Sequence, residues 1–583
     1  MTPFRETTYP TWPNLAAMVF ARARQAPTRP VLRHHADSAW HSITWATFAR
    51  QAASLARALR AHGIAAGDRV LIAAENRPEY PIAETALLAI RAVPVPVYTT
   101  YTVEDYAHVL RDCGARAVIV STPELASRVT AAYATATHPQ AIAPPDLLIT
   151  MDPPGAGYTH TQTRILRFAD LITDDLPPDD IEAEIALIPG TALACLIYTS
   201  GTGGSPKGVM LSHRAILSNC RGAYKLLQML GLQDDVYLSY LPLSHSYEHT
   251  AGQFFMLSIG AEIVYSRGTE HLAADILAAQ PTILTMVPRV LEVIRGRILQ
   301  GVARSPAFKR TLFNKALEFG LKRLDDTPLA LHERLLDKLL DRLVRAKIAD
   351  RFGGRVRLVI SGGARLEPDI GRFYLALGIR LIQGYGQTEA GPVISANIPT
   401  AIRIECVGPP LEGVALRIAE DGEICVRGDL VMDGYWGRPE ETAAAIHDGW
   451  LHTGDIGVIE PDGNLRITDR KKDIIVLAGG DNISPARVEG MLVAQPAIAQ
   501  AVVFGDGRAA LAALLVPAEG YDAPAVAHAV DAVNKRLATT ERVRRHATVE
   551  PFTLENGMLT ATQKIKRHIV RQTHTAVLEK LGA

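Results

Sequence analysis

The sequence predicts an α/β protein with a large, layered N-terminal domain over residues 1–469 and a small, mobile α+β domain over residues 470–583. Its 583 residues exceed what one hydrophobic core supports. Helix-like and strand-like apolar patterns alternate between residues 14 and 150, which is typical of stacked helix and sheet layers. A run of charged residues at 469–473 then separates two strand patterns, so we expect the domain boundary there.

The alternating patterns define the first elements. Residues 43–62 place apolar side chains at helical spacing, and Gly63 stands where a C-capping glycine would end that helix. Because helices separate the strands of this region, we expect a largely parallel sheet. A further helix is expected at residues 80–90, and strands at residues 69–74, 92–97 and 116–121.

Later segments differ in composition. Residues 151–190 are rich in Pro, Gly and Asp and predict a surface connection before a buried strand at residues 192–197. A strand at residues 356–360 ends at a glycine turn. Residues 290–350 are helical and charged, and one apolar stripe predicts an amphipathic helix packed on the core, with a membrane-binding helix as the alternative. The stripe consists of Leu335, Leu339, Leu340 and Leu343.

Composition narrows the class of protein. With 61 basic and 61 acidic residues the formal net charge is zero, so the sequence offers no electrostatic case for a nucleic-acid partner. The five cysteines show no paired or metal-binding spacing and are expected to be reduced thiols. The sequence shows no signal-peptide pattern and no run of about 20 apolar residues. We therefore expect a cytoplasmic protein, and peripheral contact with the inner membrane stays open.

Residues 198–209 are the most informative part of the sequence. They follow a buried strand and gather hydroxyls, glycines and Lys207. Glycines let consecutive backbone N–H groups turn inward, hydroxyls add donors and the lysine adds positive charge, which together suit a polyphosphate. The spacing does not fit a Walker A loop, and a flexible linker is the alternative interpretation.

Five further segments follow this glycine-rich loop in a fixed order, at residues 241–245, 383–389, 449–455, 469–473 and 556–564. Together the six segments resemble the AMP-forming acyl-adenylate synthetases, the superfamily of acyl-CoA synthetases, peptide-synthetase adenylation domains and luciferases. The resemblance covers essentially the whole chain. It implies the adenylate-forming enzyme fold, Mg²⁺ as cofactor, and ATP and CoA as co-substrates.

The resemblance implies a nucleotide site. Tyr385 would stack on adenine, and Thr388 would lie beside the α-phosphate. Asp455 has the chemistry to accept hydrogen bonds from both ribose hydroxyls, and Arg470 to donate to them. The residues expected to bind ATP or AMP are Thr199, Ser200, Gly201, Thr202, Gly203, Gly204, Lys207, Gly362, Gly363, Gln383, Gly384, Tyr385, Gly386, Thr388, Asp455 and Arg470.

A carboxylate that attacks the α-phosphate of ATP brings two anions together, so positioning and charge neutralisation must dominate the catalysis. Glu389 would bind Mg²⁺, because this ion prefers carboxylate and phosphate oxygens. Lys564 would stabilise charge on the bridging oxygen, with Lys566 as the alternative. His245 would lie at the acyl-binding floor, with a purely structural histidine as the alternative. The residues expected to be catalytic are Lys564, Glu389, Thr202 and His245.

Three positions depart from the superfamily pattern. Gly203 stands where a second threonine is usual, which removes one hydroxyl from the loop. Gln563 stands where many members carry glycine before the lysine, and Arg365 where proline is common. The long-chain acyl-CoA synthetases tolerate the glutamine, so it does not indicate an inactive protein.

The transfer of the acyl group to CoA would use the small domain. The resemblance implies that this domain rotates about a hinge near Lys472 and brings Gly479 and Gly480 beside the pantetheine tunnel. Glycines suit the close passage of a narrow chain. A hairpin turn that needs positive φ is the alternative explanation for them.

We therefore expect a ligase that converts a long- or medium-chain fatty acid and ATP into acyl-AMP and pyrophosphate, and then forms acyl-CoA and AMP. Small apolar residues between positions 247 and 263 are consistent with an acyl tunnel, and the same pattern fits an ordinary core. Two alternatives remain, a fatty-acyl-AMP ligase that delivers to a carrier protein and a non-catalytic nucleotide or acyl sensor. A homodimer also stays open.

Overall fold

The computed structural model describes residues 8–134, 145–153, 163–172, 177–199, 206–479, 481–560 and 565–582. The chain divides into two compact units. The first comprises Met1–Thr199, Pro206–Leu416 and Val426–Leu451, and the second comprises Ser200–Ser205, Arg417–Cys425 and His452–Ala583. In the described ranges, no helix is long and apolar enough to cross a membrane.

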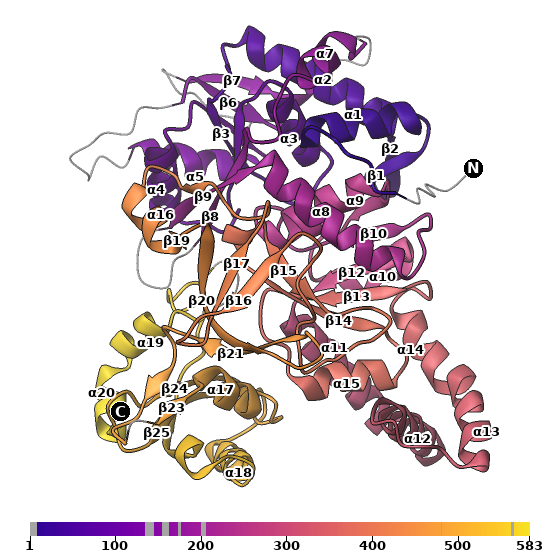
Figure 1. The fold of residues 1–583 in the computed structure, drawn as a ribbon, viewed down its shortest axis with the longest axis vertical. Coiled ribbons are helices and arrows are strands. Elements are labelled where there is room, and N and C mark those ends of the chain that lie inside the picture. The colour runs from indigo at the N-terminus through magenta and orange to yellow at the C-terminus, as the bar shows by residue number, and fades with distance from the viewer. Residues whose placement is uncertain are drawn as a thin grey trace. The chain divides into compact units, whose positions relative to one another are not determined.

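The first unit contains a five-stranded sheet ordered β4-β3-β5-β6-β7, in which all neighbours pair in parallel, as predicted. Figure 1 labels β3, β6 and β7 of this sheet. Its strands are β3 (Arg69–Ala73), β4 (Val93–Pro96), β5 (Ala117–Val120), β6 (Leu147–Thr150) and β7 (Arg164–Arg167). Helices of this region are α2 (Trp45–Ala61), α3 (Glu79–Ala89), α4 (Val103–Cys113), α5 (Pro123–Ala134), α6 (Phe168–Leu171) and α7 (Asp179–Ile185). Residues 151–190 were expected to be only a surface connection, which is wrong, because β7 extends the sheet and its Ile165 and Leu166 are half-buried.

A second sheet of the first unit has the strand order β15-β14-β13-β12-β10-β11-β1-β2. The strands from β14 to β1 pair in parallel, and the two edge strands β15 and β2 are antiparallel. Parallel pairing places the carboxyl ends of neighbouring strands at one edge of the sheet. The strands are β1 (Pro30–Ala36), β2 (Ala39–Thr44), β10 (Val236–Ser239), β11 (Glu262–Tyr265), β12 (Ile283–Met286), β13 (Leu358–Ser361), β14 (Leu381–Gly386) and β15 (Val393–Ala396).

A third, three-stranded sheet has the order β18-β9-β8, with β8 (Leu193–Thr199), β9 (Lys207–Ser212) and β18 (Gly434–Tyr435) all antiparallel. The other elements of the first unit are α1 (Leu15–Gln25), α8 (His213–Gln228), η1 (Glu248–Phe254), α9 (Phe255–Ser258), α10 (Leu272–Ala279), α11 (Pro288–Ala303), α12 (Ala307–Leu324), α13 (Leu331–Leu340), η2 (Asp341–Arg345), α14 (Ala346–Arg351), α15 (Pro368–Ala376), η3 (Thr388–Ala390), α16 (Pro439–Ala445) and β19 (Ile446–His447).

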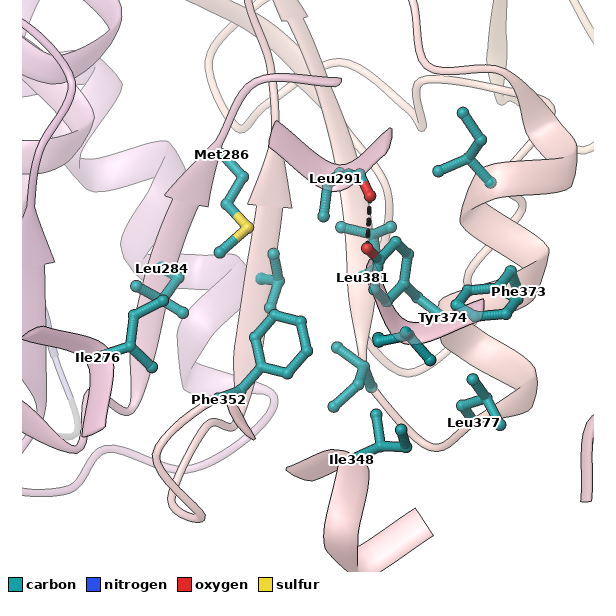
Figure 2. Close-up of a cluster of buried hydrophobic side chains, with 14 of the residues drawn as sticks. Ile276, Leu284, Met286, Leu291, Ile348, Phe352, Phe373, Tyr374, Leu377 and Leu381 are labelled. Carbon is teal, nitrogen blue, oxygen red and sulfur yellow. Dashed lines mark hydrogen bonds between the residues drawn. The ribbon is translucent and has the colours of Figure 1, made fainter. Parts of the chain in front are cut away.

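A large apolar core lies against β12, β13 and β14 of the eight-stranded sheet. Figure 2 shows side chains of this core, including Met286 of β12 and Phe373 of α15. The fully buried Tyr374 donates a 2.6 Å hydrogen bond from its hydroxyl to the carbonyl oxygen of Leu291. The one polar atom of this aromatic side chain is therefore satisfied inside the core.

Residues 290–350 are mostly helical, as predicted, but the leucine stripe does not pack on the core as a unit. Leu340 is fully buried, whereas Leu335, Leu339 and Leu343 are 71%, 50% and 40% exposed. The core-facing row of the helix is formed instead by the half-buried Leu336 and the buried Leu340 and Val344. Residues four apart share one face of a helix, so residues 335, 339 and 343 form one row and residues 336, 340 and 344 form another. Both rows are apolar in sequence, but only the second faces the core.

The second unit mixes strands and helices. In β24 (Ile498–Phe504), Ala501 and Val503 enter one core while Val502 and Phe504 enter another, because successive side chains of a strand point to opposite faces. β24 belongs to the sheet β24-β25-β26. The remaining elements from residue 415 on are β16 (Ala415–Ile418), β17 (Glu423–Arg427), β20 (Trp450–Ile459), β21 (Leu465–Arg470), β22 (Ile475–Val476), β23 (Asn482–Ile483), α17 (Pro485–Val493), β25 (Leu511–Pro517), α18 (Ala523–Asn534), η4 (Thr539–Glu541), β26 (Val543–Thr548), α19 (Arg567–Thr573) and α20 (Thr575–Leu581).

Candidate functional site

Several predicted residues of the first unit meet at one edge of the eight-stranded sheet. β10, β12, β13 and β14 run parallel, so the segments after them leave the sheet on the same side (Figure 1). His245 lies in the segment after β10, and Gly362 and Gly363 follow β13 directly. Gln383, Gly384, Tyr385 and Gly386 form the end of β14, and Thr388 and Glu389 follow it. Ligand sites of parallel α/β sheets lie outside this edge.

Two glycines at this edge are required by close contacts. A Cβ atom on Gly362 would approach the ring of Tyr247 to 2.9 Å, and Tyr247 is itself held because its hydroxyl donates to the carbonyl oxygen of Ile360. A Cβ atom on Gly386 would lie 1.8 Å from the carbonyl oxygen of Pro392. Side chains at either position would displace backbone or a ring, so these glycines serve packing at the strand ends.

The turn that carries Thr388 and Glu389 is fixed by three hydrogen bonds from two neighbouring segments. The hydroxyls of Ser246 and Thr388 are 2.9 Å apart and hydrogen-bonded. The buried Asn219 accepts from the backbone N–H of Val393 at 2.7 Å and donates to the carbonyl oxygen of Ala390 at 3.2 Å. These contacts hold η3 against α8 and the segment after β10, so both predicted side chains have a defined position.

Glu389 has a partner that the sequence did not reveal. The Tyr435 hydroxyl donates a 3.0 Å hydrogen bond to Oε1 of Glu389. Burial and the charge of Glu389 raise the pKa of Tyr435, so its phenol stays protonated and remains a donor. The Nζ atom of Lys207 lies 5.0 Å from the centre of the Tyr435 ring and also pairs with Glu441. Tyr435 thus connects Lys207 with Glu389.

Both flanks of the glycine-rich loop are anchored. Thr199 and Lys207 are register partners in the β8–β9 pair. The Tyr198 hydroxyl donates to Asp112 at 2.7 Å, and Nε2 of His108 lies 2.7 Å from the carbonyl oxygen of Pro206. The loop residues Ser200, Gly201, Thr202, Gly203 and Gly204 lie outside the described residues.

His245 is half-buried, and its ring has a defined tautomer. The backbone N–H of Tyr247 donates to Nδ1 of His245 at 3.1 Å, so a neutral ring carries its proton on Nε2. Asn76 anchors the segment before it, donating to the carbonyl oxygen of Leu241 at 2.7 Å and accepting from the N–H of Leu243 at 3.2 Å. Asn76 is a second residue that no sequence motif indicated.

Behind His245, the π-helical turn η1 buries polar side chains. Glu248 accepts hydrogen bonds from Tyr237, Ser239 and Thr285 at 2.7, 2.7 and 3.1 Å. Burial raises the pKa of Glu248 to about 7 in spite of these donors. His249 lies 2.5 Å from Glu84, and both side chains are buried. The segment 247–263, which looks apolar in sequence, therefore contains buried polar side chains that are hydrogen-bonded. The acyl tunnel in this segment stays a prediction.

In the second unit, Asp455 and Arg470 are neighbours across β20 and β21. They are register partners, and Nε of Arg470 lies 3.3 Å from Oδ1 of the buried Asp455. This cation beside an acceptor suits recognition of a vicinal diol, because the carboxylate accepts from hydroxyls to which the guanidinium donates. The predicted pair is therefore in contact, and its role with ribose stays a prediction.

Glu423 holds the turn before Asp455 in place. It accepts from the N–H of Gly454 at 2.8 Å and from Lys471 Nζ at 3.0 Å, and Nδ1 of His452 lies 3.2 Å away. Burial opposes ionisation of Glu423, but Lys471, His452 and the Gly454 N–H outweigh it and lower the pKa. Glu423 thus links the turn at Gly454 to Lys471, which lies between the predicted residues Arg470 and Lys472. Sequence reasoning missed it, because a single glutamate after a turn has no distinguishing pattern.

Predicted residues of the small domain are described only in part. Lys472 is exposed in the turn after β21, and Gly479 lies between the paired strands β22 and β23 without positive φ. A turn that needs positive φ therefore does not explain Gly479. Gly480 and Lys564 lie outside the described residues. The segment around Lys564 is bounded by a bridge between Leu559 and Ile565.

An ion pair between Arg567 and Glu489 anchors the chain just after Ile565. Arg567 binds both carboxylate oxygens of Glu489, at 2.7 and 2.8 Å.

No group of three or more His, Cys, Asp or Glu in the described part of the chain could hold a metal ion by itself. A single carboxylate such as Glu389 can hold Mg²⁺ when phosphate oxygens and water complete the shell.

A family model described as "AMP-binding enzyme" matches residues 19–436, and one described as "AMP-binding enzyme C-terminal domain" matches residues 472–581. The chain is 32% identical over 601 residues to "Long-chain-fatty-acid–CoA ligase FadD15" of Mycobacterium bovis, covering 97% of each chain. It is 30% identical over 606 residues to "Long chain acyl-CoA synthetase 6, peroxisomal" of Arabidopsis thaliana, covering 94% of this chain and 82% of that one.

Among solved structures, the O-succinylbenzoate coenzyme A synthetase of Bacillus subtilis in complex with ATP and magnesium ion superposes with a TM-score of 0.69. The two chains are 22% identical, and the match covers 95% of this chain and 98% of that chain, so the likeness concerns the fold. With the two family models, it confirms the predicted fold class of a large N-terminal and a smaller C-terminal domain. The boundary at residue 469 and the roles of single site residues stay predictions.

Proposed function

Because this chain belongs to the AMP-binding enzyme family, we propose that it is an AMP-forming ligase that joins a long- or medium-chain fatty acid to CoA. The observation that carries this proposal is the full-length similarity to proteins named as long-chain-fatty-acid–CoA ligases. A match over 97% of both chains includes the small C-terminal domain as well as the nucleotide-binding part.

The reaction has two steps. An oxygen of the fatty-acid carboxylate attacks the α-phosphorus of ATP, the bond to the β-phosphate oxygen breaks, and acyl-AMP and pyrophosphate form. The sulfur of CoA, having lost its proton to solvent, then attacks the acyl carbonyl carbon, and the bond to the AMP oxygen breaks. Both steps bring together groups of like charge or low reactivity, so positioned charges must supply most of the rate.

We propose the following roles in the first step. The glycine-rich loop with Thr202 and Lys207 would hold the β- and γ-phosphates, and Thr388 would donate to the α-phosphate. Glu389, oriented by Tyr435, would hold Mg²⁺, which neutralises phosphate charge when bound. Asp455 and Arg470 would bind the ribose, and Lys564 would stabilise charge on the bridging oxygen.

We propose different residues for the second step. The small domain would turn about Lys472, withdraw Lys564 and bring Gly479 and Gly480 to the pantetheine chain. The exposed position of Lys472 in a turn supports a hinge at this place, because hinges are short segments that absorb changes in φ and ψ.

The two alternatives are not favoured. A fatty-acyl-AMP ligase and a non-catalytic sensor would both lack the CoA-dependent step, whereas the relatives that match over most of their length are named as CoA ligases or acyl-CoA synthetases. We also propose a cytoplasmic enzyme that contacts the inner membrane from its periphery. A homodimer is a further proposal, which light scattering can test.

The decisive experiment measures AMP and pyrophosphate release from palmitate and Mg-ATP, with and without CoA. We expect AMP release that requires CoA and yields a thioester. Pyrophosphate exchange without CoA-dependent turnover would support the acyl-AMP ligase instead. A lack of turnover with any acid from acetate to oleate would overturn the enzymatic proposal.

A further inference from the structure

A row of exposed leucines lies along one side of the helix formed by α13 and η2. Its members are Leu331, Leu335, Leu339 and Leu343, which are 80%, 71%, 50% and 40% exposed. They recur every fourth residue, so they share one side of the helix over about 18 Å. We call these four residues the leucine row. Apolar side chains that line up in this way on a surface indicate a binding face.

The adjoining side of the same helix, one position after each leucine from Leu335 on, is firmly attached to the first unit. Leu336, Leu340 and Val344 pack into the core described above. The buried Arg345 donates to the carbonyl oxygen of Ala316 in α12 at 2.8 Å and pairs with Asp337 at 2.7 Å. The leucine row is therefore displayed by a helix with a fixed orientation, and it cannot turn inward without unpacking that helix.

The cations of this helix fall into two groups, the buried and paired Arg345 and the exposed cations beside the leucine row. All three acidic residues of α13 and η2 form ion pairs. Glu333 pairs with Lys322 at 2.8 Å. Asp337 pairs with Arg323 and Arg345, and Asp341 also pairs with Arg345. Three exposed cations remain beside the leucine row, each one position before a leucine, and within the described residues they form no ion pair. They are Arg334, Lys338 and Arg342.

The surrounding sequence has the same bias. Residues 288–351 contain nearly twice as many Lys and Arg as Asp and Glu, whereas the whole chain has 61 of each. A local excess of positive charge beside exposed leucines is the composition of helices that lie in the interface of an anionic bilayer.

We propose that the leucine row, with Arg334, Lys338 and Arg342, docks on the surface of a bilayer that contains anionic lipids. The leucines would enter the boundary between headgroups and acyl chains, and the three cations would meet lipid phosphates. A second copy of this chain fits less well, because an antiparallel two-fold contact through this face would place each cation row against its counterpart. The benefit of such docking rests on the proposed function, since a fatty acid dissolved in the bilayer would then be close to the enzyme.

The test is sedimentation of the full-length protein with vesicles, without any substrate. Vesicles of phosphatidylcholine alone are compared with vesicles of phosphatidylcholine and phosphatidylglycerol. We expect binding to the anionic vesicles that weakens with added salt. The variant Leu335→Gln/Leu339→Gln should lower the partition coefficient by about tenfold or more. Leu187→Gln/Leu277→Gln, which changes two exposed leucines elsewhere, should bind as the wild type does.

A second pair of variants tests the charge. Lys338→Gln/Arg342→Gln should lose about tenfold in binding to anionic vesicles and show a weaker salt dependence. The matched control is Lys535→Gln/Arg544→Gln, in which two exposed cations of the second unit are changed. Circular dichroism and AMP release with octanoate check that each variant is folded and active.

Three outcomes would overturn the proposal. The first is that the wild type fails to bind anionic vesicles. The second is that the leucine variant binds them as well as the wild type does. The third is that light scattering shows a dimer which this variant dissociates. Because vesicle binding needs no turnover, a failure of the docking proposal is distinguishable from a failure of the proposed enzymatic function, which the AMP assay measures separately.

Discussion

The hydroxyl of Tyr435 donates a 3.0 Å hydrogen bond to Oε1 of Glu389, although 46 positions separate the two residues in the sequence. The contact forms because β18 pairs with β9, so Tyr435 lies beside Val209, two positions after Lys207. A neutral phenol thus connects the exit of the glycine-rich loop with the carboxylate proposed to bind Mg²⁺. The raised pKa of Tyr435 keeps this donor protonated well above neutral pH.

Tyr435→Phe removes the donor and keeps the ring beside Lys207. We expect kcat/KM for ATP in the adenylation step to fall about tenfold, because a hydrogen bond to a charged group typically contributes about that much. The measurement is pyrophosphate exchange at several Mg²⁺ concentrations. Tyr521→Phe, at an exposed position of the second unit, is the matched control. Unchanged kinetics in Tyr435→Phe would show that the contact does not orient Glu389 for catalysis.

Glu423→Gln tests whether Glu423 positions the turn before Asp455. The amide can still accept from the N–H of Gly454, but it removes the negative charge beside Lys471. We expect KM for ATP to rise severalfold with a smaller change in kcat, and Glu420→Gln, an exposed neighbour, to behave as the wild type. A fall in kcat alone would contradict a positioning role at the ribose.

The same substitution has a pH signature. The folded-state pKa of Glu423 is lowered, so its contribution to stability is present above the unfolded pKa and is lost as the pH falls through the folded one. The free-energy difference between the wild type and Glu423→Gln should therefore shrink on acidification. Urea unfolding followed by circular dichroism at a series of acidic pH values measures it, and a constant difference would show that Glu423 does not titrate in this way.

The fold could be predicted from sequence wherever the signal is local. The helix at α2, the parallel strands β3, β4 and β5 and the strand before the glycine-rich loop follow from spacing and glycine position within short segments. Tyr435 and Glu423 could not be found in this way, because each acts through contacts between segments far apart in the chain. The stripe of Leu335, Leu339, Leu340 and Leu343 was misjudged for another reason. Neighbouring rows of apolar residues look alike in sequence, and only the packing shows that Leu336, Leu340 and Val344 face the core.

Glu248 should make stability depend on pH. Its pKa is raised by burial from the ordinary 4.5 to about 7, so the protonated form is favoured in the folded protein. Its contribution is fully present below the unfolded pKa of 4.5 and is lost as the pH rises through about 7, which amounts to roughly 3 kcal/mol. Urea unfolding across this range should show the loss in the wild type and a flatter curve in Glu248→Gln. Parallel curves for the two proteins would contradict the assignment.

Lys564→Ala should slow adenylation by about a hundredfold or more, because one positioned charge on the developing anion is removed. Thioester formation from supplied acyl-AMP and CoA should survive, since Lys564 is proposed to leave the site in that step. Lys566→Ala is the matched control, because it removes a lysine two positions away in the same basic run. Equal loss in both half-reactions would show that the role assigned to Lys564 is wrong.

Gly480→Leu should give the opposite pattern. A side chain at this position would obstruct the pantetheine chain of CoA, so thioester formation should fall by about a hundredfold while pyrophosphate exchange continues. Gly479→Ala is the milder comparison, because Gly479 has no positive φ and a Cβ atom there would come no closer than 3.3 Å to Asp481. If Gly480→Leu impairs both half-reactions equally and lowers the thermal midpoint, the glycine serves the hairpin turn between β22 and β23 rather than the passage of CoA.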